Sequence, residues 1–192
     1  MMLTIGALIL LGTTVFTVNR NSLNQGTILR QTELGVYAVT LATSYIQKAM
    51  SLDFDEGTTT RPASLPTNTV PSTILTPSAN LGREPSAGMT NRKGPTEWAN
   101  KDTSFDDFDD YNGFNLDTAI VNVDRFHITA TVYYITDVTS APPLTSTAVP
   151  TWLKRIDLCV NSSMSRKAFE ESRAVTDKGT DTIKMSYIKS YY

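Results

Sequence analysis

The pattern of apolar and polar positions divides the first part of the chain into two halves. Residues 1–18 carry no charge, and no proline interrupts the chain before Pro62. The second half has one apolar stripe at the i, i+3, i+4, i+7 spacing of a helix: Leu34, Tyr37, Ala38, Leu41, Ala42, Tyr45, Ile46, Ala49 and Met50. The pattern predicts one long N-terminal helix capped by Gly57. A local break is expected at residues 19–26, which are rich in Asn, Ser and Gly.

Three later segments alternate with the period of a β-strand. Turn signals separate them, so we expect an antiparallel meander rather than parallel crossovers. The segments are residues 126–136, 152–160 and 181–190. One face of this sheet must cover the apolar stripe of the helix. The predicted fold class is α+β, a long N-terminal helix packed by its C-terminal half on a small antiparallel sheet.

The expected organisation has three regions. Residues 1–25 form an apolar half-helix, residues 26–57 an amphipathic half-helix, and residues 58–192 a globular head that includes the sheet at 126–190. Residues 58–95 are rich in Thr, Ser and Pro, and we expect a long surface loop, with a stalk bearing O-glycans as the alternative. Apolar residues indicate that this loop drapes over the head: Val70, Ile74, Leu75 and Leu81. The triplet Asn161-Ser162-Ser163 also fits a glycosylation sequon at Asn161.

Composition argues against several classes of function. The net charge of −2 does not favour nucleic acid as a partner. Cys159 is the only cysteine, which excludes an intrachain disulfide, and His127 is the only histidine. The chain has no HExxH, no GxSxG and no Gly-rich phosphate loop. We therefore predict a protein that is not an enzyme and has no cofactor, apart from a possible calcium ion.

That calcium ion is suggested by an acidic run, Phe-Asp-Asp-Phe-Asp-Asp-Tyr-Asn-Gly-Phe at 105–114. Its four carboxylates repel one another unless a cation or hydrogen-bond donors lie among them: Asp106, Asp107, Asp109 and Asp110. Calcium binds through several oxygen ligands of this kind, although the spacing does not fit an EF-hand. Three interpretations remain open. They are a structural turn with aspartates on backbone N–H groups, which is favoured, a calcium site, and a contact between subunits.

The uncharged N-terminal stretch has no basic residue before it, unlike a secretory signal peptide. We therefore expect an N-terminus already processed. At 1.5 Å per residue it spans roughly 27 Å, slightly less than a hydrocarbon core, so a single-pass anchor is one interpretation. Its threonines and glycines instead favour close packing between helices. The residues expected to form the assembly surface are Met1, Leu3, Ile5, Leu8, Ile9, Leu10, Leu11, Val15 and Phe16.

These features together resemble the type IV pilin and pseudopilin family: an apolar N-terminus continuing as an amphipathic helix, a Thr/Pro-rich loop and a small antiparallel sheet. The run Asp-Asp-Phe-Asp-Asp-Tyr-Asn-Gly at 106–113 is similar to an element of pilin-like proteins of the mannose-sensitive haemagglutinin type. The chain departs from the family pattern in three ways. Ile5 stands where the family usually has glutamate, Met1 where it has phenylalanine, and the paired C-terminal cysteines are missing.

The resemblance implies a structural subunit of an extracellular, cell-surface filament, built as a helical homopolymer through the N-terminal helix. It also implies a stay in the inner membrane before assembly, and prepilin peptidase and the pilus assembly machinery as partners. Two alternatives share the same architecture. One is a pseudopilin of the type II secretion kind, and the other is a membrane-anchored extracytoplasmic binding module.

Overall fold

The fold is seen in a computed structural model that describes residues 2–59, 70–83, 102–121, 123–162 and 182–191. Its main elements are helix α1 (Met2–Ser51), the short helix α2 (Glu56–Thr59), and four strands, β1 (Asn115–Ile120), β2 (Asp124–Tyr134), β3 (Leu153–Ser162) and β4 (Thr182–Ser190). The chain divides into two compact units, Met1–Tyr37 and Ala38–Tyr192. The fold class is α+β, as predicted.

The first unit is helical from Met2 onward, and α1 continues without interruption through residues 19–26. The predicted break there is therefore wrong. A single glycine costs a helix about 1 kcal/mol relative to alanine, and asparagine and serine cost less. Because extending an existing helix is far easier than nucleating one, the helix on both sides of this segment can offset the local penalty.

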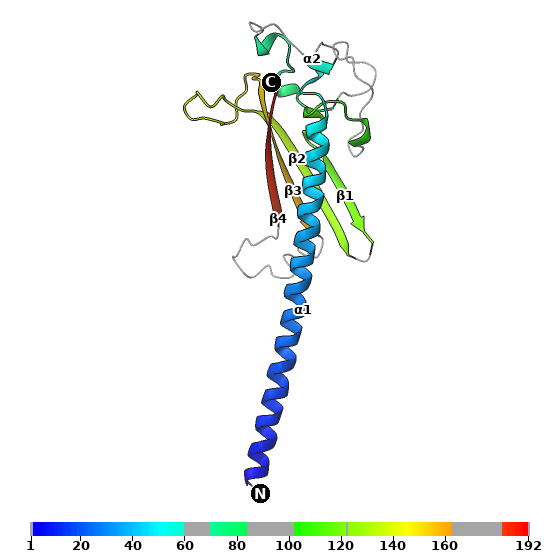
Figure 1. The fold of residues 1–192 in the computed structure, drawn as a ribbon, viewed down its shortest axis with the longest axis vertical. Helices are drawn as coiled ribbons and strands as arrows, with labels where there is room; N and C mark the ends of the chain where they lie inside the picture. The colour runs from blue at the N-terminus through cyan, green and yellow to red at the C-terminus, as the bar shows by residue number, and fades with distance from the viewer. Residues whose placement is uncertain (1, 60–69, 84–101, 122, 163–181, 192) are drawn as a thin grey trace. The chain divides into compact units, whose positions relative to one another are not determined.

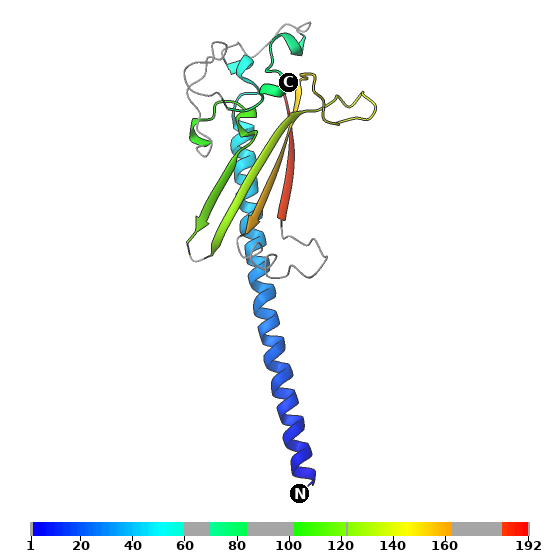
Figure 2. The ribbon, with the colours of Figure 1, turned by 180° about the vertical axis from the view of Figure 1, so that it is seen from behind.

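In the second unit, the four strands lie in the order β1-β2-β3-β4, and each neighbouring pair is antiparallel (Figures 1 and 2). The three predicted strands and the meander are confirmed. The sequence did not predict β1. Its side chains alternate only between exposed and half-buried positions, so it lacks a strong apolar period.

The core of this unit lies between one face of the sheet and the part of α1 after Tyr37. Both views show α1 crossing the sheet on a single face (Figures 1 and 2). The helix buries Ala38, Ala42, Ile46 and Ala49 on that side, and the two central strands bury Phe126, Ile128, Ala130, Val132, Ile156, Leu158 and Val160. Three of the four helical side chains are alanines, which let the helix backbone approach the sheet closely. The predicted stripe is confirmed at these four positions, and Leu41 and Tyr45 are half-buried, whereas Met50 at its end is exposed.

Helix α1 ends at Ser51, before the predicted cap at Gly57. Lys189 on β4 supplies hydrogen-bond donors to the backbone carbonyl groups around this helix end. Its Nζ donates to the carbonyls of Met50 (3.2 Å) and Asp53 (3.1 Å) and also to that of Leu52. Burial lowers the pKa of Lys189 to about 8.

Gly57 has a different role from the predicted one. A Cβ atom at this position would lie 2.1 Å from the carbonyl oxygen of Ile74, so only glycine allows the two backbones to meet. The prediction that the Thr/Pro-rich loop drapes over the head is confirmed for two of its apolar residues. Leu75 and Leu81 join Phe54 and Tyr134 in a buried cluster, whereas Val70 is exposed. Residues 60–69 and 84–95 of this loop lie outside the described residues, and its O-glycosylation stays a prediction.

Candidate functional site

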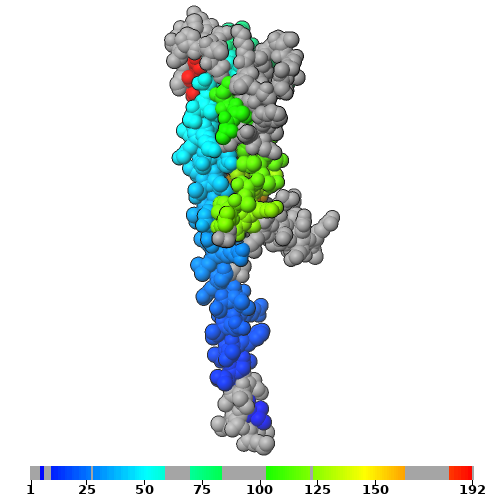
Figure 3. Space-filling model, turned by 90° about the vertical axis from the view of Figure 1, so that its right-hand side faces the viewer, coloured from blue at the N-terminus to red at the C-terminus, as the bar shows by residue number. Residues whose placement is uncertain are grey.

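The first unit carries a row of large apolar side chains on the outside of a helix. Ile5, Leu10, Leu11, Val15 and Phe16 are between 54% and 71% exposed. Figure 3 shows the described atoms of this stretch in dark blue. All five belong to the predicted assembly surface. Of its other members, Met1 lies outside the described residues, as do the side chains of Leu3, Leu8 and Ile9, although their backbone is helical.

Three threonines whose side chains the structure describes in this stretch donate their hydroxyl groups to carbonyls of the same helix. Thr13 and Thr14 donate to the carbonyl of Leu10 at 2.9 and 2.7 Å, and Thr17 donates to the carbonyl of Thr13 at 2.8 Å. A hydroxyl bonded to its own helix can enter an apolar environment without the cost of an unsatisfied donor. Within the described residues, no helix has both the length and the apolarity that a membrane crossing requires.

In the second unit, the acidic segment (residues 105–114) folds as a compact turn around the 3₁₀ helix η4 (Asp109–Tyr111). The Asp107 carboxylate accepts the backbone N–H groups of Asp109 (2.8 Å) and Asp110 (3.2 Å), and the Asp110 carboxylate accepts those of Asp106 (3.0 Å) and Asp107 (3.1 Å). Its aromatic rings stack edge to face: Phe105, Tyr111 and Phe114. This is the arrangement that the structural interpretation of the acidic run predicts.

The geometry of the acidic segment gives less support to the calcium interpretation. Among the described residues, no group of three or more His, Cys, Asp or Glu side chains is arranged to hold a metal ion. Asp107 and Asp110 direct oxygen atoms at backbone N–H groups, and Asp109 contacts an ammonium group. Calcium binding at Asp106, Asp107, Asp109 and Asp110 stays a prediction.

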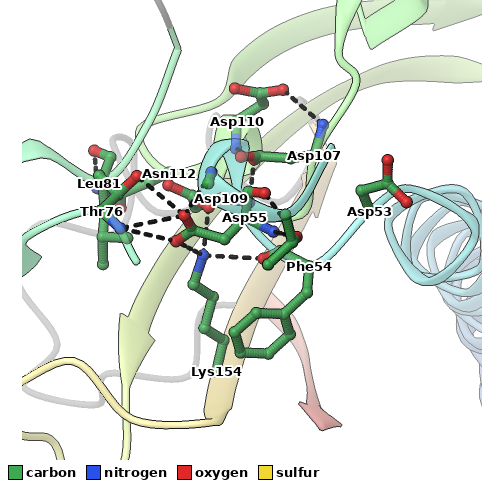
Figure 4. Close-up of polar contacts among 12 residues, drawn as sticks. Asp53, Phe54, Asp55, Thr76, Leu81, Asp107, Asp109, Asp110, Asn112 and Lys154 are labelled. Atoms are coloured by element: carbon green, nitrogen blue, oxygen red, sulfur yellow. Dashed lines mark hydrogen bonds and ion pairs between the residues drawn. The ribbon is translucent and has the colours of Figure 1, made fainter. Parts of the chain in front are cut away.

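The ammonium group is that of Lys154 on β3, which is completely buried. Its Nζ donates to the Asp55 carboxylate at 2.7 Å, to the Phe54 carbonyl at 2.9 Å and to the Asp109 carboxylate (Figure 4). Asp55 and Asp109 are buried as well. The rings of Phe54 and Tyr134 lie beside the ammonium, with centroids 4.8 and 5.2 Å from Nζ. These residues form a charge cluster with no access to water.

Protonation within this cluster follows from its charge balance. Burial raises the pKa of Asp107 well above its usual value, and the Asp109 and Asp110 carboxylates act in the same direction. Burial also raises the pKa of Asp109 despite Lys154. For Asp55, the opposing effect of burial is outweighed by Lys154 and by hydrogen bonds from Gly57 and Thr76, which lower its pKa.

Lys154 itself stays charged. Burial alone would lower its pKa, but the Asp109, Asp55 and Asp107 carboxylates outweigh that effect and raise it. One ammonium thus lies among three carboxyl groups and offsets their charge only in part, which favours the protonated form of Asp107.

Sequence reasoning missed this cluster. The alternation in β3 places Lys154 on the same face as Ile156, Leu158 and Val160, which is where the structure has it. A lysine in phase with three apolar residues was the available signal for a buried charge.

Three other singled-out residues lie on the sheet. The Asn161 side chain accepts a hydrogen bond from the Thr182 hydroxyl at 2.5 Å across the β3–β4 pair, and its glycosylation stays a prediction. His127 Nδ1 lies 2.8 Å from the Asp117 carboxylate, and Cys159 is a half-buried free thiol.

Comparison of the chain with protein-family models, with curated proteins and with solved structures finds no match. The long N-terminal helix packed on a four-stranded antiparallel sheet is compatible with a pilin-like fold at the level of architecture.

Proposed function

We propose that this protein is a structural subunit of an extracellular type IV pilus-like filament, assembled through its N-terminal helix. One observation carries the proposal. From Ile5 to Val18 the described side chains include no charge, and the large apolar ones among them are more than half exposed in the single chain. Such a surface is stable in water only when something apolar covers it, because burial yields about 25 cal/mol per Å².

The second unit does not need the same cover. Its part of α1 already buries Ala38, Ala42, Ile46 and Ala49 within its own core. The large exposed apolar side chains that need cover are therefore those of the first unit, between Ile5 and Val18. A helix apolar on several sides suits the interior of a bundle better than a single contact.

Further copies of this chain are the partner that fits best. The hydroxyl groups of Thr13, Thr14 and Thr17 are satisfied within the helix, and nothing lies within 4 Å of a Cβ built at Gly6 or Gly12. Neighbouring helices can approach closely at such positions. A contact between two different surfaces of the same subunit does not close on itself, and repeating it along an axis gives a helical polymer.

The resemblance to type IV pilins supplies the remaining parts of the proposal. By that resemblance, prepilin peptidase removes a leader, the inner membrane holds the subunit before assembly, and the pilus assembly machinery adds it to a filament on the cell surface. The work of the protein is then mechanical and structural, with no catalysis and no resident cofactor.

The test is electron microscopy of material sheared from cells that make the full-length protein. We expect filaments from the unaltered chain and none from Leu10→Arg, which would place an unpaired charge in the assembled core. Val121→Arg is the matched control, because Val121 is an 83% exposed aliphatic residue outside the helix, and it should leave filaments intact.

Deletion of residues 1–25 provides a second arm of this test, and we expect a soluble monomer from it. Filaments made by the Leu10→Arg chain would contradict the proposal. So would an unaltered protein recovered only as a membrane-bound monomer, the result that a membrane-anchored binding module predicts.

A further inference from the structure

The charge cluster around Lys154 brings together the two partners of an amide bond. The Lys154 amine and the Asp109 carboxyl group touch, although they lie 45 residues apart in the chain. Both side chains are buried, at 0% and 2% exposure. A lysine amine and a carboxyl group held together in a dry site have the composition of an amide plus one molecule of water.

The two carboxylates that contact Lys154 are not equivalent. Asp55 accepts hydrogen bonds from Tyr134 Oη (2.9 Å), Gly57 N–H (2.9 Å), and the backbone N–H (3.0 Å) and hydroxyl (3.2 Å) of Thr76. These donors hold the Asp55 carboxylate in place, with one oxygen 2.7 Å from Nζ and so within reach of an ammonium proton.

Asp109 has a weaker set of donors. Beyond its contact with Lys154, its second oxygen accepts one long hydrogen bond, from Gly82 N–H at 3.4 Å. The neighbouring Asp107 carboxyl group accepts the backbone N–H of Asp109 at 2.8 Å, which keeps the two carboxyl groups close together. Protonation of Asp109 would make it the better electrophile, because its carbon would then carry more positive charge.

We propose that an isopeptide bond forms between Lys154 Nζ and Asp109 Cγ, with Asp55 as the base that receives the proton of the ammonium. The neutral amine attacks Cγ, a C–N bond forms and one C–O bond of Asp109 breaks. Two of the three ammonium protons leave with that oxygen as water, and the third remains on the amide nitrogen. Asp55 and Asp107 relay protons and end as they began, and no oxidation or reduction occurs.

The surroundings favour this reaction in two ways. Holding the reactants together in one geometry converts a bimolecular step into a unimolecular one, for which effective molarities reach about 10⁵ M or more. Exclusion of water also removes the ordinary hydration of the amine and the competitor that would reverse the bond. Phe54 and Tyr134, whose rings flank Nζ, provide that exclusion, and Figure 4 shows the Phe54 ring beside the Lys154 side chain.

The bond would join η4 to β3 and close the chain from residue 109 to residue 154. In a sequence with a single cysteine, no disulfide within the chain can make such a closure. The inference does not depend on whether the protein forms filaments.

The experiment is mass spectrometry of the full-length protein, dissolved in detergent and kept at pH 7 until its mass no longer changes. We expect a mass lower by one water than that of the same chain without the bond. After proteolysis, the peptide that contains Asp109 should be joined to the peptide that contains Lys154. Exposure to mild alkali should leave this link in place, whereas a cyclic imide formed by dehydration of the backbone would open.

Matched variants distinguish the groups. Lys154→Arg keeps the charge but removes the nucleophile, and Asp109→Ala removes the electrophile, so both should retain the full mass. Lys189→Arg is the control, because Lys189 Nζ contacts backbone carbonyls at the end of α1, and it should still lose one water. Asp109→Asn should lose one ammonia instead of one water. Asp55→Asn, which lacks the base, should keep the full mass.

An unaltered protein with the full mass of its sequence would overturn the inference without any variant. Loss of water that persists in Lys154→Arg would do the same. A link between Lys154 and Asp55 instead of Asp109, or a linked product from Asp55→Asn, would overturn the assignment of roles.

Discussion

The buried charge of Lys154 is stabilised only because carboxylates are buried beside it. Before any bond to Asp109 forms, its ammonium group is matched by Asp55 and Asp109, and burial beside these charges favours the protonated form of the third carboxyl group, Asp107. A buried ion pair of this kind is a weak source of net stability, because desolvation offsets the attraction. Removing one partner is nevertheless costly, since it leaves the other charge buried and uncompensated.

Two matched substitutions should therefore have opposite effects. Asp55→Asn removes a charge that faces Lys154, and we expect it to lower the free energy of unfolding at pH 7 by about 3–5 kcal/mol. Asp107→Asn mimics the protonated carboxyl group and can still accept the N–H groups of Asp109 and Asp110, so stability at pH 7 should be unchanged or higher. Denaturant unfolding in detergent, followed by tryptophan fluorescence, measures both against unaltered protein that still has the full mass of its sequence.

The same pair predicts the pH dependence. The pKa of Asp107 in the folded protein lies above its usual 3.8, so the folded protein holds a proton that the unfolded chain releases. This proton contributes to the free energy of unfolding below pH 3.8, and the contribution is lost as pH rises through the raised pKa. Asp55 behaves oppositely, because its pKa is lowered, and its contribution is lost as pH falls through the folded value. Asp107→Asn should flatten the decrease of stability above pH 3.8. An unchanged pH profile in that variant would contradict the assignment of the proton.

Among the elements, the acidic segment is the one that connects the helix to the sheet. Just after α1, Asp53 forms two backbone hydrogen bonds with this segment. Its N–H donates to the carbonyl of Asp106 (3.2 Å), and its carbonyl accepts the N–H of Phe108 (2.9 Å). On the other side, Phe114 and Ala130 of β2 are joined by a backbone bond of 3.0 Å. The segment thus has its place fixed by backbone contacts on both sides.

Because these contacts and the N–H groups on Asp107 and Asp110 account for the shape of the segment, we expect it to keep that shape without a metal ion. A chelator should leave the melting temperature unchanged. A ligand that binds only the folded state would raise it by linkage, so a lower melting temperature in chelator that is restored by added calcium would establish the calcium site instead. Magnesium in place of calcium is the control for a general effect of divalent ions.

The elements also show where sequence reasoning works and where it stops. The period of β2 and β3 is strong because alternate residues such as Ile128 and Leu158 are fully buried, and both strands were predicted. Residues 19–26 were misjudged because propensity was weighed without the helical flanks. The pairing of Lys154 with Asp55 was out of reach, since it depends on a contact across 99 residues that no local pattern encodes.

At the scale of the whole molecule, the two units have different requirements. The second unit has a complete core, whereas the first carries its apolar side chains outward and has its first charge only at Arg20. Ile5 stands at the position where the resembling family usually has glutamate. In the proposed filament, the register of neighbouring subunits therefore depends on apolar packing rather than on an ion pair at the N-terminus.

Filaments should accordingly respond little to salt. Raising the ionic strength from about 0.01 M to about 1 M shortens the Debye length from about 30 Å to about 3 Å and weakens charge interactions, but it does not weaken apolar burial. The sedimentable fraction of sheared filaments should stay constant over this range. Ile5→Glu, which introduces a carboxylate into the same stretch, should make that fraction depend on salt. Unaltered filaments that dissociate as salt is raised would contradict apolar register.

The order of the charge cluster along the chain has a consequence for biosynthesis. Asp55 and Asp109 are made before Lys154, and the N-terminal parts of a chain emerge first. A chain interrupted before β3 therefore contains two carboxylates destined for the interior and lacks the ammonium group that neutralises them. Such a fragment also lacks β3 and β4, so we expect proteases to cut it more readily than the whole chain. The charge cluster can form only after Lys154 has been added.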